Sequence, residues 1–208
     1  PNNPTSTFNT DEELKALFGQ LGPDGPVIVL DEAYGEFAQD AYPKLYPNSI
    51  PSYFKLYPKL IVLRTLSKIM GLAGMRIGYC VAEKELIASI NKAKLIFNVT
   101  SLSQLAAREA LKDHEHYQRT LKVIGEGRRY LEEQLKSLGF DVVGPGAANF
   151  IFAKVPKGPG SELYLKLLDQ GVIIRPISEK GIESYVRISI GAPSENRILV
   201  HALKKVLL

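Results

Sequence analysis

Cysteine is almost missing from this sequence, which has a single one, Cys80, in an apolar run that reads as a strand. One cysteine cannot form a disulfide within the chain, and its isolation fits a reducing compartment. Neither a helix N-terminus nor a histidine is evident beside Cys80, so a catalytic thiol is not expected. We expect Cys80 to be buried apolar filler.

Long apolar runs and concentrated charge are missing as well. No apolar run reaches the roughly 18 residues that a membrane helix needs, and we expect no signal peptide. The net charge of +4 is spread along the chain rather than gathered in one basic tract, which argues against nucleic-acid binding and is compatible with anionic substrates. No P-loop pattern is present. We therefore expect a cytoplasmic protein with neither a nucleic-acid nor a membrane partner.

The first position lacks a methionine. The chain opens at Pro1-Asn2-Asn3-Pro4-Thr5, which looks like the interior of a motif. We expect the N-terminal part of a longer protein to precede it. The 208 residues have room for one large domain or two small ones.

The chemistry that is present centres on the end of a short apolar run. Leu60–Leu63 predicts a buried strand, and Thr65, Ser67 and Lys68 follow at its end. Arg76 comes eight residues after the lysine. Two hydroxyls and a guanidinium could hold a phosphate, and a lysine drawn out of water takes its nucleophilic, neutral form more readily. Taken alone, a strand followed by a solvated lysine is an equally good interpretation.

A second apolar run also ends in polar side chains. Val27–Leu30 reads as a parallel strand buried on both faces, and Asp31 and Tyr34 come directly after it. Ligands of open α/β sheets bind at the carboxyl ends of the strands. An acid and a tyrosine are therefore well placed for a site, although Asp31 could also be a helix cap or a solvated loop acid.

The order of predicted elements indicates two parts. Strands alternate with helical or covered segments over residues 1–110, which is an α/β layer pattern, and residues 35–58 are expected to be irregular. A long helix spans about residues 113–138, and short strands and helices after it predict a small α+β domain. We expect domains at 1–112 and 113–208.

Several local signals mark where helices begin, and one argues against a metal site. Thr10 and Glu13 form a capping box, and Ser101 and Ser194 are candidate N-caps for two later helices. The pair in His114-Glu115-His116 has a spacing that splays two rings apart on a helix, so no metal site is expected.

Two arginines lie on predicted strands of the second part. Val172–Arg175 reads as a strand ending in Arg175, and Arg187 lies in the alternating run Tyr185–Ile190. A surface salt bridge is the alternative role for each arginine.

Together these residues resemble the fold-type I pyridoxal-phosphate aminotransferases over nearly the whole chain. The recurring signatures are Pro1-Asn2-Asn3-Pro4-Thr5, Asp31-Glu32-Ala33-Tyr34, Ser67-Lys68 and Gly74-Met75-Arg76-Ile77-Gly78. Further stretches are similar to the histidinol-phosphate branch: Phe97-Asn98-Val99, Ala148-Asn149-Phe150, Gly171–Pro176 and Val186–Gly191. Each motif is weak alone, and the ordered series is strong. Ser6 departs from the family's glycine and is expected to loosen that turn.

The resemblance implies three catalytic residues and a fold. Lys68 would hold the cofactor covalently and then move a proton between the substrate's Cα and the cofactor's C4′. Asp31 would pair with the protonated pyridine nitrogen, and Tyr34 and Asn3 would hydrogen-bond the ring's 3′ oxygen. The implied fold is α/β, with part of a three-layer αβα large domain followed by a small α+β C-terminal domain.

The resemblance also implies how anions are bound. The cofactor's phosphate would be held by two hydroxyls and an arginine: Thr65, Ser67 and Arg76. Arg187 would bind the carboxylate of glutamate or 2-oxoglutarate, and Arg175 with Arg187 would serve the phosphate of histidinol phosphate, because an arginine fork suits both anions. Asn149 would also line the substrate site.

The implied reaction is transfer of the amino group of histidinol phosphate to 2-oxoglutarate in a homodimer that uses pyridoxal 5′-phosphate. An aromatic or broad-specificity aminotransferase and a threonine-phosphate decarboxylase are alternatives within the family. Outside it, an effector domain of a regulator and a generic phosphate-binding domain stay open. The family's phosphate loop, the aromatic that stacks on the cofactor ring and a tyrosine from the partner subunit would lie before Pro1, so we expect this chain not to transaminate alone.

Overall fold

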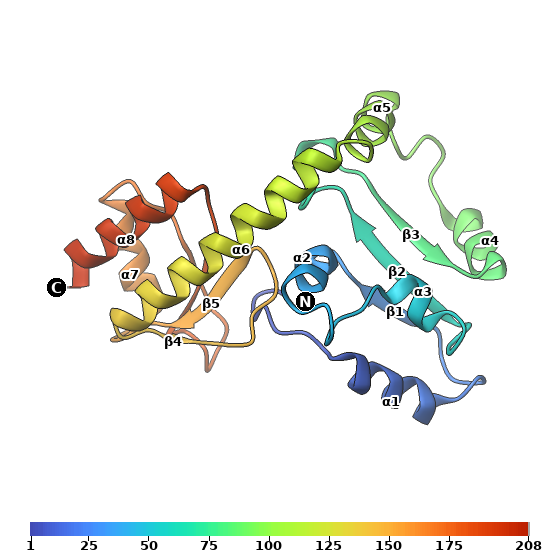
Figure 1. The fold of residues 1–208 in the computed structure, drawn as a ribbon, viewed down its shortest axis with the longest axis horizontal. Coiled ribbons are helices and arrows are strands. Elements are labelled where there is room, and N and C mark those ends of the chain that lie inside the picture. Colours follow the sequence, from blue (N-terminus) through green and yellow to red (C-terminus); the bar gives the residue numbers. More distant parts are fainter. Residues whose placement is uncertain (208) are drawn as a thin grey trace. The chain divides into compact units, whose positions relative to one another are not determined.

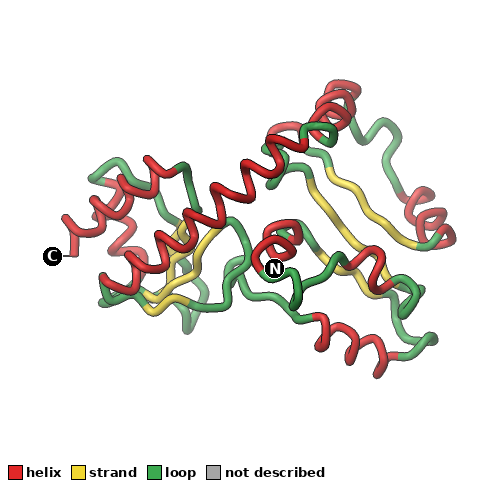
Figure 2. Tube along the Cα trace, in the orientation of Figure 1, coloured by secondary structure: helices red, strands yellow, loops and turns green. Residues whose placement is uncertain are grey.

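The computed structural model describes residues 1–207 and contains two compact units (Figure 1). One unit is Asn9–Arg119, and the other combines Pro1–Phe8 with the chain from Thr120 onward. Each unit has its own sheet, shown in yellow in Figure 2. The division into domains at 1–112 and 113–208 remains a prediction.

A three-stranded mixed sheet forms the centre of the unit Asn9–Arg119. Its strands are, in spatial order, β1 (Ile28–Asp31), β2 (Leu60–Thr65) and β3 (Gly78–Ala82). β2 runs parallel to β1 and antiparallel to β3. The parallel pair places the carboxyl ends of β1 and β2 at the same edge of the sheet, as the sequence predicts.

Two helices cover one face of this sheet. They are α1 (Asp11–Leu21) and α3 (Ser49–Tyr53), and they pack Leu14, Phe18 and Tyr53 against Leu60 and Val62 of β2. The capping box at the start of α1 is confirmed, because both the Thr10 side chain and the Glu13 side chain accept the reciprocal backbone bonds.

The prediction that β1 is buried on both faces is wrong. Val29 points away from α1 and α3 and is 56% exposed, and burial along β1 alternates between intermediate and exposed. β1 lies at the edge of the three-stranded sheet, and the core cluster that includes α1 and α3 packs against Ile28 and Leu30 of β1 and not against Val29.

The prediction of an irregular segment over residues 35–58 is also wrong. This segment contains α2 (Gly35–Ala41) as well as α3. Pro51 lies in the first turn of α3, where its missing N–H costs nothing. Asn48 caps that helix by accepting from the Ile50 N–H at 3.3 Å.

The remaining elements of this unit lie directly before β3 or after it in the chain. They are the short 3-10 helix η1 (Ala73–Met75), α4 (Lys84–Ala93), α5 (Ser101–Ala110) and the start of α6 (His114–Ser137). The N-cap of α5 is Thr100 rather than Ser101, because the Thr100 hydroxyl accepts from the Ser103 N–H at 3.1 Å.

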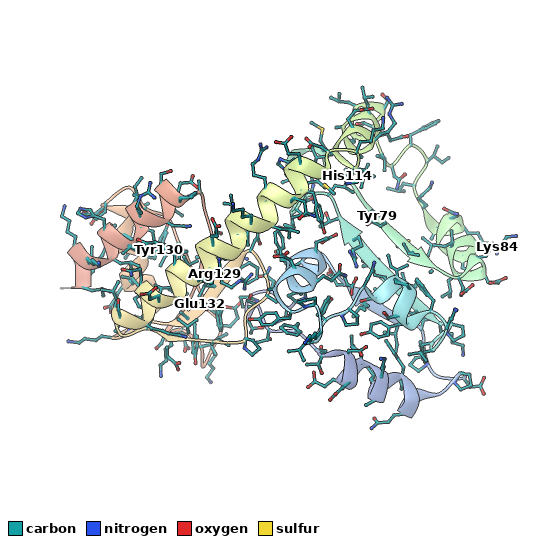
Figure 3. The ribbon with its side chains drawn as sticks, in the orientation of Figure 1. Tyr79, Lys84, His114, Arg129, Tyr130 and Glu132 are labelled. Carbon is teal, nitrogen blue, oxygen red and sulfur yellow. The ribbon has the colours of Figure 1, made fainter. Side chains whose placement is uncertain are left out.

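A four-stranded antiparallel sheet forms the other unit. Its spatial order is β4 (Asp141–Val142), β5 (Phe150–Lys154), β7 (Tyr185–Ser189) and β6 (Arg175–Pro176). Its core is built by α6, α7 (Gly160–Leu168) and α8 (Pro193–Leu207) against one face of β5 and β7. Tyr130 of α6, labelled in Figure 3, packs against this core.

Two boundaries in this unit differ from the prediction. The strand expected at Val172–Arg175 is reduced to Arg175–Pro176, the residues of this segment that pair with β7. Ser194 lies inside α8 and does not cap it; instead the Glu195 carboxylate accepts from the Ala192 N–H at 2.7 Å. Pro193 suits the first helical position because its nitrogen has no hydrogen to satisfy.

Within residues 1–207, every helix is too short or too polar to span a bilayer. The prediction that Cys80 is buried is wrong, because this free thiol on β3 is partly exposed.

Candidate functional site

The ends of β1 and β2 bring together a lysine and a tyrosine that are far apart in sequence. Asp31 is paired with Leu63 across the two strands, and Tyr34 and Lys68 each follow their strand within a few residues. The Lys68 Nζ lies 5.2 Å from the centroid of the Tyr34 ring. Asp31 is exposed at this edge, and its Oδ1 accepts from the Ala33 N–H at 2.9 Å.

The loop that carries Lys68 is closed on itself by backbone hydrogen bonds. The Leu72 N–H donates to the Leu66 carbonyl at 3.0 Å, and the Gly71 N–H donates to the Lys68 carbonyl at 3.1 Å. Gly71 has a φ of 68°, a conformation that glycine adopts without steric cost. The lysine is therefore presented from a constrained turn.

The Thr65 hydroxyl and the Arg76 guanidinium, both near Lys68, have separate local partners. The Thr65 Oγ1 accepts from the Ser67 N–H at 3.1 Å. Arg76 is exposed in a left-handed conformation with a φ of 49°, and its NH1 donates to the Ala73 carbonyl at 3.0 Å. That bond uses one of the five donors of the guanidinium.

Behind this edge lies a buried charged cluster that our sequence analysis missed. Glu32, which follows Asp31, is fully buried, and Arg64, which precedes Thr65, is 8% exposed. The Arg64 Nε donates to the Glu32 Oε2 at 2.8 Å, and its NH1 donates to the Glu36 Oε1 at 3.2 Å. The available signal was a charged residue just after each apolar run: Arg64 directly follows Leu63, and Glu32 is the second residue after Leu30.

The cluster shifts the titration of its own members. Burial raises the pKa of Glu36, partly opposed by the Arg64 charge. Burial alone would lower the pKa of Arg64, but the charges of Glu32 and Glu36 outweigh it and raise that pKa. Burial, followed by the charge of Glu32, raises the pKa of Tyr46.

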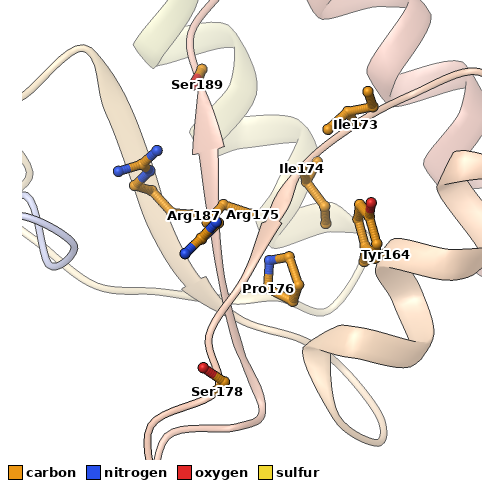
Figure 4. Close-up of a pocket in the computed structure, with 8 residues that line it drawn as sticks. All are labelled: Tyr164, Ile173, Ile174, Arg175, Pro176, Ser178, Arg187 and Ser189. Carbon is orange, nitrogen blue, oxygen red and sulfur yellow. The ribbon is translucent and has the colours of Figure 1, made fainter.

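The other unit places two arginines directly opposite each other. Arg175 on β6 is the cross-strand partner of Arg187 on β7, so both side chains lie on the same face. They line a cavity of about 560 Å³, with Tyr164, Ser178 and Ser189 among its other walls (Figure 4). Among residues 1–207, neither arginine has a carboxylate within 4.0 Å. Like charges directly opposite destabilise a sheet, so this cavity suits an anion.

Arg187 is held from two sides. Its NH1 donates to the Asn3 Oδ1 at 2.9 Å, and its guanidinium carbon lies 5.2 Å from the centroid of the Phe150 ring. The buried Nε of Arg187 has no hydrogen-bond partner among residues 1–207. Asn149 is partly buried directly before β5, where its carbonyl accepts from the Ile190 N–H at 3.0 Å.

The loop before Asn149 is fixed by a buried serine and a buried arginine. The Ser6 Oγ accepts from the N–H groups of Ala147 and Ala148 at 3.0 and 2.8 Å. The Arg128 guanidinium donates to the carbonyls of Gly146 and Ala148. Ser6 keeps a φ of 62°, so the turn where the family has a glycine is retained with serine.

The predicted site residues fall into two groups, one in each unit. The unit Asn9–Arg119 holds Asp31, Tyr34, Thr65, Ser67, Lys68 and Arg76, whereas the other unit holds Asn3, Asn149, Arg175 and Arg187. His114 begins α6 (Figure 3), and no cluster of metal-ligating side chains occurs within the described part of the chain.

The chain resembles known aminotransferases in sequence and in structure. It is 42% identical over its whole length to histidinol-phosphate aminotransferase 1 of Nitrosococcus oceani, of which it covers 54%. The crystal structure of the histidinol-phosphate aminotransferase from Clostridium acetobutylicum matches 99% of the chain, which covers 61% of that structure, with a TM-score of 0.89 and 29% identity. The enzyme from Sinorhizobium meliloti, solved in complex with pyridoxal 5′-phosphate, matches the whole chain with a TM-score of 0.86 and 28% identity, over 55% of its length.

The chain thus spans about half the length of the curated relative it matches. Its α/β architecture agrees with part of the large domain of these pyridoxal-phosphate enzymes. The family model for class I and II aminotransferases matches residues 1–203. The chain therefore belongs to the class I and II aminotransferase family, whose members depend on pyridoxal 5′-phosphate.

Proposed function

We propose that the protein transfers the amino group of histidinol phosphate to 2-oxoglutarate, giving imidazole acetol phosphate and glutamate in histidine biosynthesis. The observation that carries this proposal is the cross-strand pair Arg175 and Arg187. Two opposed guanidinium groups on a 560 Å³ cavity favour a ligand with a phosphate or a carboxylate. Both substrates of this reaction carry such a group.

The side chains at the strand ends fit pyridoxal 5′-phosphate by their chemistry. The constrained Lys68 offers an amine, and the exposed Asp31 offers a carboxylate. The nearby hydroxyl and guanidinium groups suit a phosphate: Thr65, Ser67 and Arg76. The buried Arg187 Nε without a partner is a further donor for an anion.

Lys68 and Asp31 would carry out the central chemistry. The cofactor, when bound, supplies a ring that withdraws electrons from the substrate's Cα. The Lys68 Nζ would hold the cofactor covalently and, once substrate displaces it, move the proton between the substrate's Cα and the cofactor's C4′. Asp31 would keep the ring nitrogen protonated.

The remaining residues would orient the reactants. Tyr34 and Asn3 would hydrogen-bond the ring's 3′ oxygen. Arg187 would bind the carboxylate of 2-oxoglutarate, Arg175 would join it on the phosphate of histidinol phosphate, and Asn149 would line the same site. The proposal includes a cytoplasmic homodimer and a division of the chain at residues 112 and 113.

Reduction with borohydride tests the covalent role. The complete protein, including any residues that precede Pro1, is loaded with pyridoxal 5′-phosphate, reduced and mapped by peptide mass spectrometry. We expect the label on Lys68 and none in Lys68→Arg. A label on another lysine, or no absorbance from a bound cofactor, would refute the assignment.

Turnover with different donors tests the substrate. We expect histidinol phosphate to be preferred over phenylalanine, with no release of carbon dioxide from threonine phosphate. Arg175→Gln should raise the KM for histidinol phosphate about tenfold or more, because it removes a charge-assisted hydrogen bond to the phosphate. The KM for phenylalanine should rise less. The matched control is Arg129→Gln, an exposed arginine on α6. Preference for phenylalanine would instead indicate an aromatic aminotransferase.

A further inference from the structure

In the buried cluster behind the strand ends, both carboxylate oxygens of Glu32 have hydrogen-bond partners. Glu32 Oε2 lies 2.8 Å from the Arg64 Nε and 2.6 Å from its NH2. Glu32 Oε1 accepts from the Tyr46 hydroxyl at 2.9 Å and from the Ser49 hydroxyl. Side chains from β2, from the segment before α3 and from the first residue of α3 therefore fix the orientation of one glutamate at the end of β1.

The cluster lies next to residues assigned to the cofactor on both strands. The Glu32 N–H donates to the Leu63 carbonyl at 3.0 Å, which continues the β1–β2 ladder one residue past Asp31. Arg64 is the last buried residue of β2 before the turn with Lys68. Because neighbouring side chains of a strand point to opposite faces, burial of Glu32 directs Asp31 outward.

Stability alone gives a poor account of this arrangement. Replacing a buried ion pair by apolar residues of similar volume is often neutral or stabilising. Here two carboxylates, Glu32 and Glu36, share the single guanidinium of Arg64, and the Glu36 Oε2 has no hydrogen-bond partner among residues 1–207. These buried charges are costly, but their hydrogen bonds hold the side chains in fixed orientations. This combination favours a role in positioning neighbouring residues.

We propose that Glu32 and Arg64 are positioning residues that lock the carboxyl ends of β1 and β2 together, so that Asp31 and Lys68 are held in the geometry the cofactor requires. The inference rests on the proposed function. Displacement of a reacting group by about 1 Å costs on the order of a hundredfold in rate. The lock therefore acts on catalysis through Asp31 and Lys68, without touching the cofactor itself.

Two substitutions and a matched control test the lock in the complete protein. Glu32→Gln and Arg64→Met each remove the ion pair while keeping most of the side-chain volume. Tyr57→Phe removes a buried hydroxyl that donates to the Pro26 carbonyl at 2.5 Å, just before the amino end of β1. The readouts are the melting temperature, the Kd for pyridoxal 5′-phosphate from absorbance titration, and the visible absorbance of the bound cofactor.

We expect Glu32→Gln and Arg64→Met to raise the Kd about tenfold or more and to shift the absorbance of the bound cofactor. Tyr57→Phe should lower the melting temperature and leave both cofactor readouts unchanged. The double variant Glu32→Gln/Arg64→Met should regain melting temperature relative to Arg64→Met, which leaves both Glu32 and Glu36 without a cation, but it should not regain cofactor affinity. A purely structural role predicts that affinity recovers together with stability.

Variants that lose melting temperature but keep the wild-type Kd and absorbance would overturn the positioning role and leave the proposed function intact. Failure of the wild-type protein to bind the cofactor would overturn both. If Glu32→Gln does not fold, Tyr46→Phe removes a single donor to Glu32. It should produce a smaller shift in the same direction, and an unchanged Kd and absorbance in that variant would likewise overturn the lock.

Discussion

At the scale of single residues, Ser6 combines backbone strain with two specific hydrogen bonds. Its φ of 62° lies in the left-handed region, which costs a non-glycine residue about 1 kcal/mol or more. The hydroxyl offsets this cost by accepting from Ala147 and Ala148 in a fully buried position. A glycine would satisfy the backbone, but only serine supplies the acceptor.

Ser6→Ala and Ser6→Gly separate these two contributions. Ser6→Ala keeps the strain and leaves the buried Ala148 N–H without its acceptor, so we expect a loss of about 1–3 kcal/mol in the free energy of unfolding. Ser6→Gly loses the same bond but relieves the strain, so its loss should be about 1 kcal/mol smaller. Urea denaturation followed by circular dichroism measures both. Equal losses would show that the φ angle carries no strain.

Glu36 is expected to make the stability of its unit depend on pH. Burial raises its folded pKa above the unfolded value of 4.5. The resulting stabilisation is complete below pH 4.5 and disappears as the pH rises through the raised folded pKa. Glu36→Gln stays neutral and can still accept from Arg64. It should therefore be more stable than wild type at neutral pH, with the advantage shrinking toward pH 4.5.

Thermal unfolding across this pH range measures the effect of Glu36. Glu183 provides a control in which the pKa shifts in the opposite direction. Hydrogen bonds from its own backbone N–H and from the Gly181 N–H lower the pKa of Glu183. Glu183→Gln should reduce stability at neutral pH, and the difference should fade as the pH drops below 4.5. A pH-independent effect of Glu36→Gln would contradict the raised pKa.

At the scale of elements, the two glycines in the middle of α6 have opposite roles. A Cβ on Gly125 would meet no atom within 4 Å, whereas a Cβ on Gly127 would lie 2.6 Å from the Ile190 Cγ2 and 2.8 Å from the Asn196 Nδ2. Both glycines weaken the helix by their propensity. Only Gly127 is required, because it lets the chain at Ile190 and α8 approach α6 closely.

Alanine substitution distinguishes the two glycines. Gly125→Ala should raise the free energy of unfolding by about 0.5–1 kcal/mol, the difference in helix propensity. Gly127→Ala should lower it by about 1–3 kcal/mol through overpacking. The measurement is urea denaturation of the two variants beside wild type. Stabilisation by both would mean that Asn196 and Ile190 move aside without cost.

Local patterns predicted most elements because their signals lie within a few residues. The capping box at Thr10 and the apolar run of β2 are examples. The misses were elements decided by distant partners. α2 packs Phe37 and Ala38 inward without a side-chain cap, and β6 is only as long as its pairing with β7.

At the scale of the whole molecule, the chain holds both groups of predicted site residues but spans about half of its curated relatives. We predict that the chain of residues 1–208, tested alone, turns over no histidinol phosphate. The family resemblance assigns neither the phosphate loop nor the ring-stacking aromatic to any residue of this chain. Glutamate formation from 2-oxoglutarate measures turnover, with the complete protein as the control. Activity of the isolated chain would show that these 208 residues form a sufficient site.

The sequence by itself determined the family and the candidate chemistry. Asp31, Tyr34 and Lys68 could be singled out because polar residues directly after apolar runs mark the carboxyl ends of buried strands. The capping and strand signals behind that reading depend only on residues that are close in the chain.

Only the tertiary structure decided which distant side chains meet. It set Arg175 opposite Arg187, joined Glu32 to Arg64, and left Val29 exposed on an edge strand. Strand register, burial and ion pairing depend on partners tens of residues away, and no local pattern encodes those partners.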